Sequence, residues 1–134
     1  MQYDILQAIG ETMKMKLPER RRFVRVESPL KIVVRCGDRV ETLVTKNISP
    51  VGFRFETATA LDESKKLEIA LSLPTAKQPI ELEAQVVWQS KISLEDKAPY
   101  DVGVDITSIE DKSKNIFLKY LCDLLYGSIY KERT

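Results

Sequence analysis

The sequence predicts an all-β domain: a six-stranded antiparallel barrel with a C-terminal α-helix and a short helical arm at its N-terminus. Between residues 30 and 106, apolar and polar residues alternate in six segments, and residues typical of turns separate these segments. After residue 108, apolar residues recur every three or four positions, as on an amphipathic helix. The 134 residues suit one domain with a modest core. We assign residues 1–18 to an N-terminal helical segment and residues 19–134 to the barrel domain, C-terminal helix included.

The N-terminal segment is expected to form a short amphipathic helix over residues 2–16 and to end at Pro18. Between Pro18 and Pro29, the chain is expected to form an irregular arm. The apolar residues at helical spacing in the first segment are Ile5, Leu6, Ile9 and Met13.

Six strands are expected in the middle of the chain. Gly37 and Asp38 indicate a tight hairpin between the first two strands, and Pro79 separates the fourth from the fifth. The six strands are predicted at residues 30–36, 39–46, 52–57, 65–73, 80–92 and 100–106.

A helix is expected after the last strand. Ser108 and Asp111 resemble a capping box, with an acid in the first helical turn. The helix is apolar over more than the usual width, so we expect the N-terminal helix or a second protomer to cover part of it. One apolar stripe comprises Phe117, Tyr120, Leu121, Leu124 and Leu125, and a second comprises Leu118, Cys122, Tyr126 and Ile129.

Composition argues against several classes of function. The net charge of +1 gives no overall field for nucleic acid or a membrane surface. The chain contains no histidine, the usual general base and the commonest metal ligand. Without histidine, a metal-binding cluster or convergent carboxylates, the sequence offers no apparatus for acid–base or nucleophilic chemistry, so we expect no enzymatic activity and no metal site.

The N-terminal residues lack the basic start and long apolar run of a signal peptide, and nothing approaches a membrane span. Cys36 and Cys122 lie in apolar contexts and are predicted to be two buried thiols, consistent with a reducing compartment. We therefore expect a cytoplasmic protein without a membrane partner.

A basic run precedes the first predicted strand. Between Lys14 and Arg25 there are six basic residues and one acid, Glu19, which gives a local charge of +5. Arginine dominates the run, and its planar fork binds phosphate or the O6/N7 edge of guanine through two hydrogen bonds. Two alternatives remain open for the run by itself: a solvated surface, or sequence-independent binding of nucleic acid.

The stretch NISPVGF at residues 47–53 follows the second predicted strand. As a turn, it would use Asn47 for an Asx-turn, Pro50 for its fixed φ and Gly52 for a positive φ. The same residues, with Ser49, also offer an amide, a hydroxyl and close backbone approach to a ligand. Both interpretations fit the stretch when it is taken alone.

The basic run and this loop together form a recognisable pattern. R-x-x-x-R at Arg21 and Arg25, followed by N-x-S-x-x-G at residues 47–52, resembles the signature of PilZ domains, bacterial receptors for the second messenger cyclic di-GMP. VVW ending at Trp88 and VGVDI at residues 102–106 resemble later parts of the family pattern. The resemblance covers about residues 19 to 125 and implies a PilZ-type β-barrel.

The resemblance also implies roles for individual residues. Arg21 and Arg25 would bind guanine edges and phosphates, Asn47 and Ser49 would complete these contacts, and Gly52 would shape the loop. Arg20 and Arg22 are expected to add contacts, and an arginine at the position of Arg20 is associated in the family with a stacked pair of ligand molecules. For Trp88, two roles stay open: stacking on a base, or packing on the barrel beneath the arm.

The resemblance implies a receptor with cyclic di-GMP as ligand and no other cofactor. Ligand binding would move the N-terminal arm and helix and so signal to an unidentified downstream protein. The chain is expected to be a monomer or a homodimer formed through its helices, and not to bind nucleic acid. The alternative is a PilZ-like adaptor of a pilus or motility complex that binds no ligand.

Overall fold

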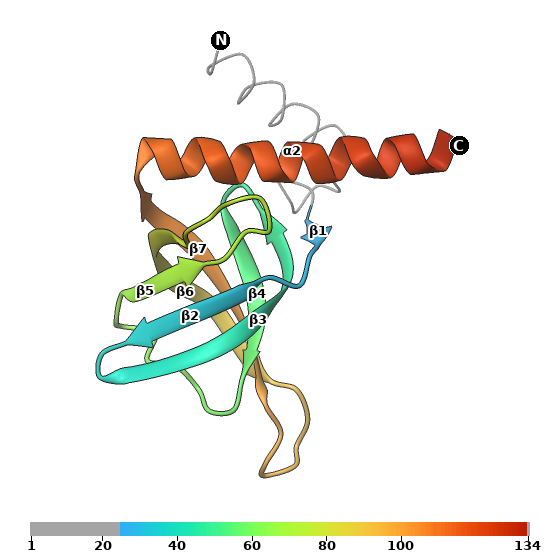
Figure 1. The fold of residues 1–134 in the computed structure, drawn as a ribbon. Helices are drawn as coiled ribbons and strands as arrows, with labels where there is room; N and C mark the ends of the chain where they lie inside the picture. The colour runs from blue at the N-terminus through green and yellow to red at the C-terminus, as the bar shows by residue number, and fades with distance from the viewer. Residues whose placement is uncertain (1–24, 134) are drawn as a thin grey trace.

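The computed structural model describes residues 25–133, with the side chains of residues 25–126. This part of the chain folds into seven β-strands and one long helix, α2, which lies across one end of the sheet structure (Figure 1). The elements are β1 (Val26–Glu27), β2 (Lys31–Cys36), β3 (Arg39–Ser49), β4 (Gly52–Thr57), β5 (Leu67–Leu71), β6 (Ile80–Lys91), β7 (Tyr100–Ile109) and α2 (Asp111–Arg133). The predicted helix over residues 2–16 and most of the predicted arm lie outside the described residues.

The strands form one antiparallel sheet in the order β1-β3-β2-β5-β6-β7-β4, and an additional pairing between β3 and β4 closes it into a barrel. The six strands from β2 to β7 make up this barrel, so the predicted fold class is confirmed. The two-residue strand β1 is an addition, because the sequence predicted an irregular arm there. It pairs with the end of β3, at Val26↔Ile48 and Glu27↔Asn47.

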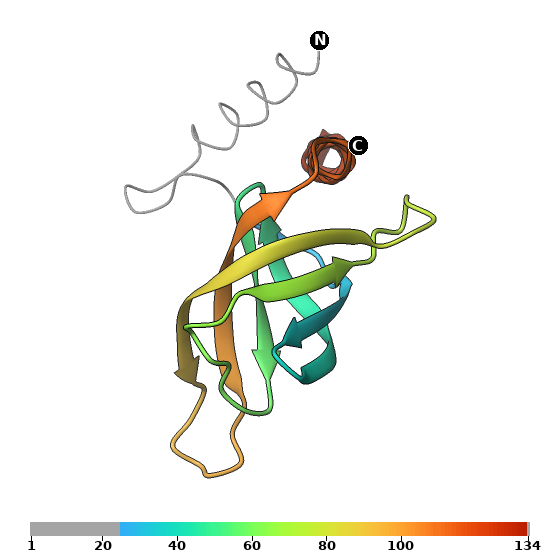
Figure 2. The ribbon, with the colours of Figure 1, turned by 90° about the vertical axis from the view of Figure 1, so that its left-hand side faces the viewer.

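The alternation of apolar residues places one face of each strand in a common core. Figure 2 shows α2 end-on above the barrel, and its buried residues Phe117, Leu118 and Leu121 pack against this core. Larger core residues from the strands include Ile32, Ile48, Phe55, Leu67, Leu71 and Val102.

The start of α2 corrects one sequence prediction. Ser108 is not a helix cap, because β7 continues to Ile109 and Ser108 pairs with Glu83 of β6. The helix begins at Asp111, and the backbone carbonyl of Glu110 accepts the first helical hydrogen bond from the N–H of Lys114 at 2.8 Å. Glu110 therefore holds the cap position, and Asp111 supplies the acid that favours the helix N-terminus.

The outer side of α2 is less buried than its barrel side. Cys122 is only partly buried, which corrects the prediction of two buried thiols, whereas Cys36 is buried as expected. Tyr126 is 50% exposed, and the C-terminal half of the helix extends beyond the barrel (Figure 1). Covering of this helix by the N-terminal segment or a second protomer stays a prediction.

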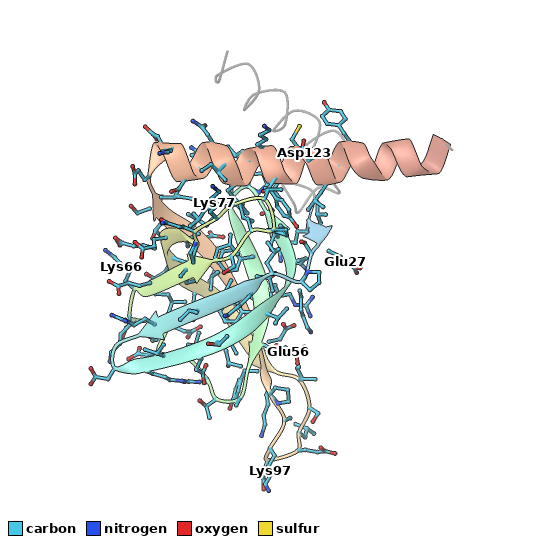
Figure 3. All side chains as sticks on the ribbon, viewed as in Figure 1. Glu27, Glu56, Lys66, Lys77, Lys97 and Asp123 are labelled. Atoms are coloured by element: carbon cyan, nitrogen blue, oxygen red, sulfur yellow. The ribbon has the colours of Figure 1, made fainter. Side chains whose placement is uncertain are left out.

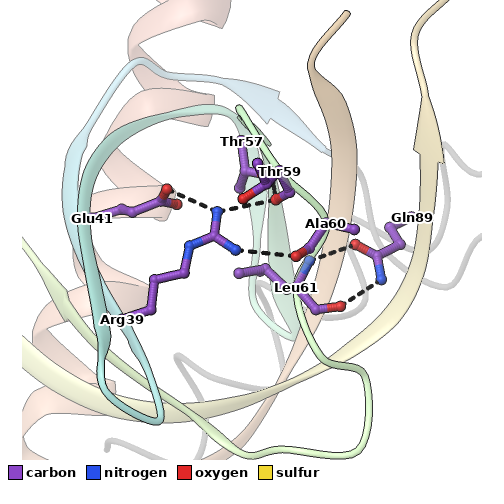
Figure 4. A network of polar contacts seen from close by, with 7 residues as sticks. All are labelled: Arg39, Glu41, Thr57, Thr59, Ala60, Leu61 and Gln89. Atoms are coloured by element: carbon purple, nitrogen blue, oxygen red, sulfur yellow. Dashed lines mark hydrogen bonds and ion pairs between the residues drawn. The ribbon is translucent and has the colours of Figure 1, made fainter. Parts of the chain in front are cut away.

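One edge of β3 is closed by a side chain instead of a strand. β4 pairs with β3 only over Thr45–Ser49, and the earlier part of β3 faces the segment that follows β4. The Arg39 guanidinium donates to the carbonyls of Thr59 and Ala60, both at 3.0 Å, and pairs with Glu41 at 2.8 Å (Figure 4). Charged side chains at such an edge also oppose pairing with another chain.

The same segment is held from the other side by Gln89 of β6. Its amide nitrogen donates to the carbonyl of Leu61 at 2.8 Å, and its amide oxygen accepts from the N–H of Leu61 at 3.1 Å (Figure 4). Leu61 itself is buried in the core. Arg39 and Gln89 together hold the β4–β5 connection between β3 and β6, where β4 does not pair with the first part of β3.

We predict that Arg39→Ala lowers the free energy of unfolding by about 1–2 kcal/mol, since charge-assisted bonds to two carbonyls are lost at a partly exposed site. The measurement is the midpoint of urea unfolding. Arg35→Ala, at an exposed position on the neighbouring strand, is the control and should stay within about 0.5 kcal/mol of wild type. Equal losses in both variants would contradict the closing role of Arg39.

Candidate functional site

Four strands place their residues in one row across the outer surface of the barrel. Asn47 of β3 pairs with Arg54 of β4, Arg54 pairs with Gly103 of β7, and Gly103 pairs with Trp88 of β6. Directly paired residues on neighbouring strands lie on the same face of a sheet. Asn47, Arg54 and Trp88 are all partly exposed, in keeping with this outer face.

A bulge in β3 brings Asn47 to the outer face. Thr45 pairs with Phe55, and the next paired residue is Asn47, so Lys46 is the extra residue. Thr45 and Ile48 are both buried, at 2% and 0% exposure. Strict alternation from Thr45 would have turned Asn47 inward, and the inserted residue reverses its direction. The amide of Asn47 is therefore available at the surface.

A second bulge, in β6, does the same for Trp88. Val86 is buried and pairs with Val104, Val87 is 50% exposed, and Trp88 then pairs with Gly103. The indole lies directly on the backbone of Gly103, where a Cβ would come within 2.2 Å of the indole Nε1. Glycine is thus required at residue 103, because any side chain would displace the indole.

Arg54 lies next to this indole and is held firmly. Its guanidinium carbon is 5.9 Å from the centre of the Trp88 ring, a cation–π distance. Its Nε donates to Asp101 at 2.8 Å, and a second guanidinium nitrogen binds the other carboxylate oxygen. The hydrogen bond that Arg54 donates to Asp101 is the main reason that the pKa of Arg54 is raised, so the guanidinium stays charged.

Two further charges adjoin this pair. The Lys46 ammonium lies 2.5 Å from the Glu56 carboxylate and 4.0 Å from that of Asp101. The side chain of Asp101 is only 13% exposed, so its charge is shared between Lys46 and Arg54 away from bulk water. This network keeps the guanidinium of Arg54 in place beside the indole.

Arg25 and Asn47 connect the two parts of the sequence pattern. The guanidinium of Arg25 donates to the amide oxygen of Asn47 at 3.4 Å, a long hydrogen bond at an exposed position. The following strand, β1, keeps these residues close, because Glu27 pairs with Asn47. Arg20, Arg21 and Arg22 lie outside the described residues, so their predicted contacts remain predictions.

The loop between β3 and β4 differs from its prediction. β3 runs to Ser49, so the turn consists only of Pro50 and Val51, and Asn47 lies in a strand instead of an Asx-turn. Ser49 is 4% exposed; its hydroxyl donates to the carbonyl of Gly52 at 3.2 Å and accepts from the N–H of Val51 at 3.3 Å. The hydroxyl therefore shapes the turn, and its contact with a ligand stays a prediction.

Gly52 has a different role from the one predicted. Among the described residues, only Gly37 has a positive φ, of 61°. At Gly52, a Cβ would come within 2.0 Å of the carbonyl oxygen of Val104 on the neighbouring strand. Glycine is needed here for the close approach of β4 and β7, which brings Arg54 beside Gly103.

Sequence reasoning missed Arg54 and Asp101. Both belong to alternating segments that correctly predicted strands, and their charge only marked the solvent face. The register between β4 and β7 could have revealed their proximity, but a single sequence gives no register for strands that far apart.

A cavity of about 410 Å³ lies on another part of the barrel surface. Its walls carry the carboxylates of Glu68, Glu81, Glu83 and Glu110, with Arg35 as the basic residue. Lys66 marks the side of this cavity, because it pairs with Glu83 at 2.7 Å, and Glu27 of β1 marks the side of Arg25. Figure 3 shows Lys66 and Glu27 on opposite sides of the barrel. This acidic cavity is unsuited to an anionic ligand, in contrast to the surface around Arg25.

Within the part of the chain that the structure describes, no group of histidine, cysteine or carboxylate side chains could hold a metal ion. The same residues include no helix that is both long and apolar enough to cross a membrane.

Comparisons with known proteins agree with this fold. The family model described as PilZ domain matches residues 19–122. A comparison with curated proteins gave no significant match.

Among solved structures, the PilZ domain of YcgR from Escherichia coli, solved with c-di-GMP, has a TM-score of 0.63 at 15% identity, covering 87% of this chain and 99% of that one. MotI/DgrA of Bacillus subtilis, an inhibitor of motility, has a TM-score of 0.66 at 19% identity over 85% of this chain and 54% of its own. PlzA of Borreliella burgdorferi, solved in complex with c-di-GMP, has a TM-score of 0.62 at 15% identity over 96% and 58%. The chain thus spans little more than half the length of the last two proteins, and at these identities the likeness shows the fold.

We predict that Gly103→Ala displaces the indole of Trp88 from β7, because the added Cβ would overlap the ring. Trp88 is the single tryptophan, so its fluorescence reports the change directly, and the emission maximum should shift to longer wavelength as the ring becomes more exposed.

Gly52→Ala is the control, because its Cβ would meet backbone instead of the indole. It should lower the unfolding midpoint while leaving the emission of the folded protein unchanged. An unshifted spectrum in folded Gly103→Ala would contradict the packing of Trp88 on Gly103.

Proposed function

The chain belongs to the PilZ domain family, and we propose that it acts as a receptor for cyclic di-GMP. The observation that carries the proposal is the contact of Arg25 with Asn47, which joins the two parts of the family signature beside Arg54 and Trp88. Receptor function also agrees with the solved complexes of YcgR and PlzA with c-di-GMP.

The chemistry of the surface suits a guanine dinucleotide. Arg21 and Arg25 would bind phosphate oxygens and guanine edges through paired N–H donors. The amide of Asn47 offers both a donor and an acceptor to the edge of a base. The Trp88 ring and the Arg54 guanidinium provide adjacent flat surfaces on which a base can stack.

The hydroxyl of Ser49 can contact a ligand only as far as its hydrogen bonds within the turn allow. Its single hydroxyl proton goes to the carbonyl of Gly52, and one lone pair accepts from Val51. To donate to a phosphate oxygen, the Ser49 hydroxyl would have to turn its proton away from the Gly52 carbonyl and towards the ligand. An N–H of guanine, in contrast, could use the remaining lone pair without disturbing the turn.

The proposed signal begins in the basic run. Six basic residues between Lys14 and Arg25 repel one another, and the two phosphates of the ligand would neutralise part of that charge. Binding would fix this run against the barrel at an entropic cost and displace the N-terminal segment, which a downstream protein would recognise. Arg20 and Arg22 would add contacts, with Arg20 favouring a stacked pair of ligand molecules.

A ligand-free adaptor of a pilus or motility complex remains the second candidate, and one protein of similar fold, MotI/DgrA, is an inhibitor of motility. The presence of Arg21, Arg25, Asn47, Ser49 and Gly52 together favours the receptor, because an adaptor would have no need of this set.

We predict that calorimetric titration with cyclic di-GMP gives saturable binding that Arg21→Ala and Arg25→Ala each weaken about 10- to 150-fold, as expected for charge-assisted bonds worth about 1.5–3 kcal/mol. Arg35→Ala removes an exposed arginine from β2 and should bind as wild type does.

An oligonucleotide competitor should leave the titration unchanged, whereas effective competition would favour a nucleic-acid binder. The absence of binding by folded wild-type protein would support the adaptor instead.

We predict that saturating cyclic di-GMP changes the hydrogen exchange of residues 2–16, since their segment joins the basic run at Pro18. The measurement is amide exchange followed by mass spectrometry, with and without ligand, and Arg25→Ala at the same ligand concentration serves as the control. Unchanged exchange in residues 2–16 of a saturated protein would rule out this segment as the output.

A further inference from the structure

A partly buried polar contact links the segment after β1 to α2. Ser28 is 5% exposed, and its hydroxyl lies 3.0 Å from the hydroxyl of Tyr120 on α2. The carbonyl of Ser28 accepts a hydrogen bond from the Thr45 hydroxyl at 2.6 Å, and that hydroxyl accepts from the N–H of Leu30 at 2.9 Å. Ser28 is thus fastened to the barrel through its backbone and to the helix through its side chain.

The position of β1 depends on few interactions. The strand has two residues, and only the pairs Val26↔Ile48 and Glu27↔Asn47 join it to β3. So short a strand is marginal by itself. Arg25 precedes β1 and Ser28 follows it, so a shift of β1 moves the Arg25 guanidinium relative to Asn47. β1 lies directly beneath α2 (Figure 1), where Tyr120 reaches Ser28.

We propose that Tyr120 is a positioning residue for Arg25: its hydroxyl holds β1 through Ser28, and α2 thereby responds to the binding of cyclic di-GMP. The inference rests on the proposed function for its ligand. Neither Tyr120 nor Ser28 is part of the family signature.

The coupling runs in both directions. A ligand that binds Arg25 in its position beside Asn47 favours the docked arrangement of β1, and so favours the contact between Ser28 and Tyr120. Conversely, a protein that binds α2 and withdraws Tyr120 lowers the fraction of molecules with Arg25 in place, and the apparent dissociation constant rises accordingly. The helix is therefore a second output surface, distinct from the N-terminal segment.

The direct test is Tyr120→Phe, which removes only the hydroxyl and keeps the ring. We expect cyclic di-GMP to bind about three- to tenfold more weakly in calorimetry, the effect of one ordinary hydrogen bond on an equilibrium constant. Tyr126→Phe, on the same helix but 50% exposed, is the matched control and should bind as wild type does.

Ser28→Ala provides the second arm of the test. It removes the other hydroxyl, so it should weaken binding to a similar degree, and Tyr120→Phe combined with Ser28→Ala should be no weaker than either alone. Additive losses in the double variant would show that the two hydroxyls act independently and would overturn the inference.

Hydrogen exchange separates positioning from stability alone. In wild type and Tyr126→Phe, saturating ligand should protect amides of α2 near Tyr120, and in Tyr120→Phe this protection should be lost while that of β3 and β4 remains. Wild-type affinity in folded Tyr120→Phe, or α2 protection that persists in it, overturns the inference and leaves the receptor function intact. Failure of the wild type to bind cyclic di-GMP would overturn both.

Discussion

The register of β3, β4, β7 and β6 determines the candidate site, and two extra residues place Asn47 and Trp88 on its outer face. Lys46 and Val87 are each inserted into a strand, and each insertion reverses the face of the residues that follow. Without them, the amide of Asn47 and the indole of Trp88 would point into the barrel instead of outward. The outer row also depends on Gly103, since the indole of Trp88 reaches towards Arg54 only across a residue without a side chain.

The two arginines of this surface differ in how they are held. Two of the three guanidinium nitrogens of Arg54 bind the largely buried carboxylate of Asp101, so its charge is compensated and its geometry is fixed before any ligand arrives. Arg25 donates to the neutral amide of Asn47 at 3.4 Å, a long hydrogen bond at an exposed position. A base stacks best on a flat surface that is preorganised, and the pair of Arg54 and Trp88 suits this task. In the proposed function, Arg25 would instead bind phosphate oxygens and guanine edges.

Local patterns in the sequence predicted the six barrel strands, the hairpin at Gly37 and the C-terminal helix, because alternation and helical spacing depend on neighbouring residues. The prediction that Ser108 caps the helix was wrong because β7 continues to Ile109, beyond the predicted end at residue 106. Short polar residues suit a strand end as well as a helix cap. The sequence did not predict features that depend on pairing between distant segments. These are the bulges, the two-residue strand β1 and the ion pair of Arg54 with Asp101. The signature residues Arg25 and Asn47 were found from the resemblance to the PilZ pattern, and the structure brings them together.

The strand β1 is the point at which ligand and output meet. Its N-terminal end leads through Arg25 into the basic run and the N-terminal segment, and its C-terminal end leads through Ser28 to Tyr120. Two residue pairs join it to β3 and Val26 packs against the core, so it is held by fewer interactions than a barrel strand with its full ladder. In the proposed mechanism, a ligand bound at Arg25 therefore stabilises the docked position of this strand more than that of any barrel strand. β1 is then the strand that connects the site with both candidate outputs.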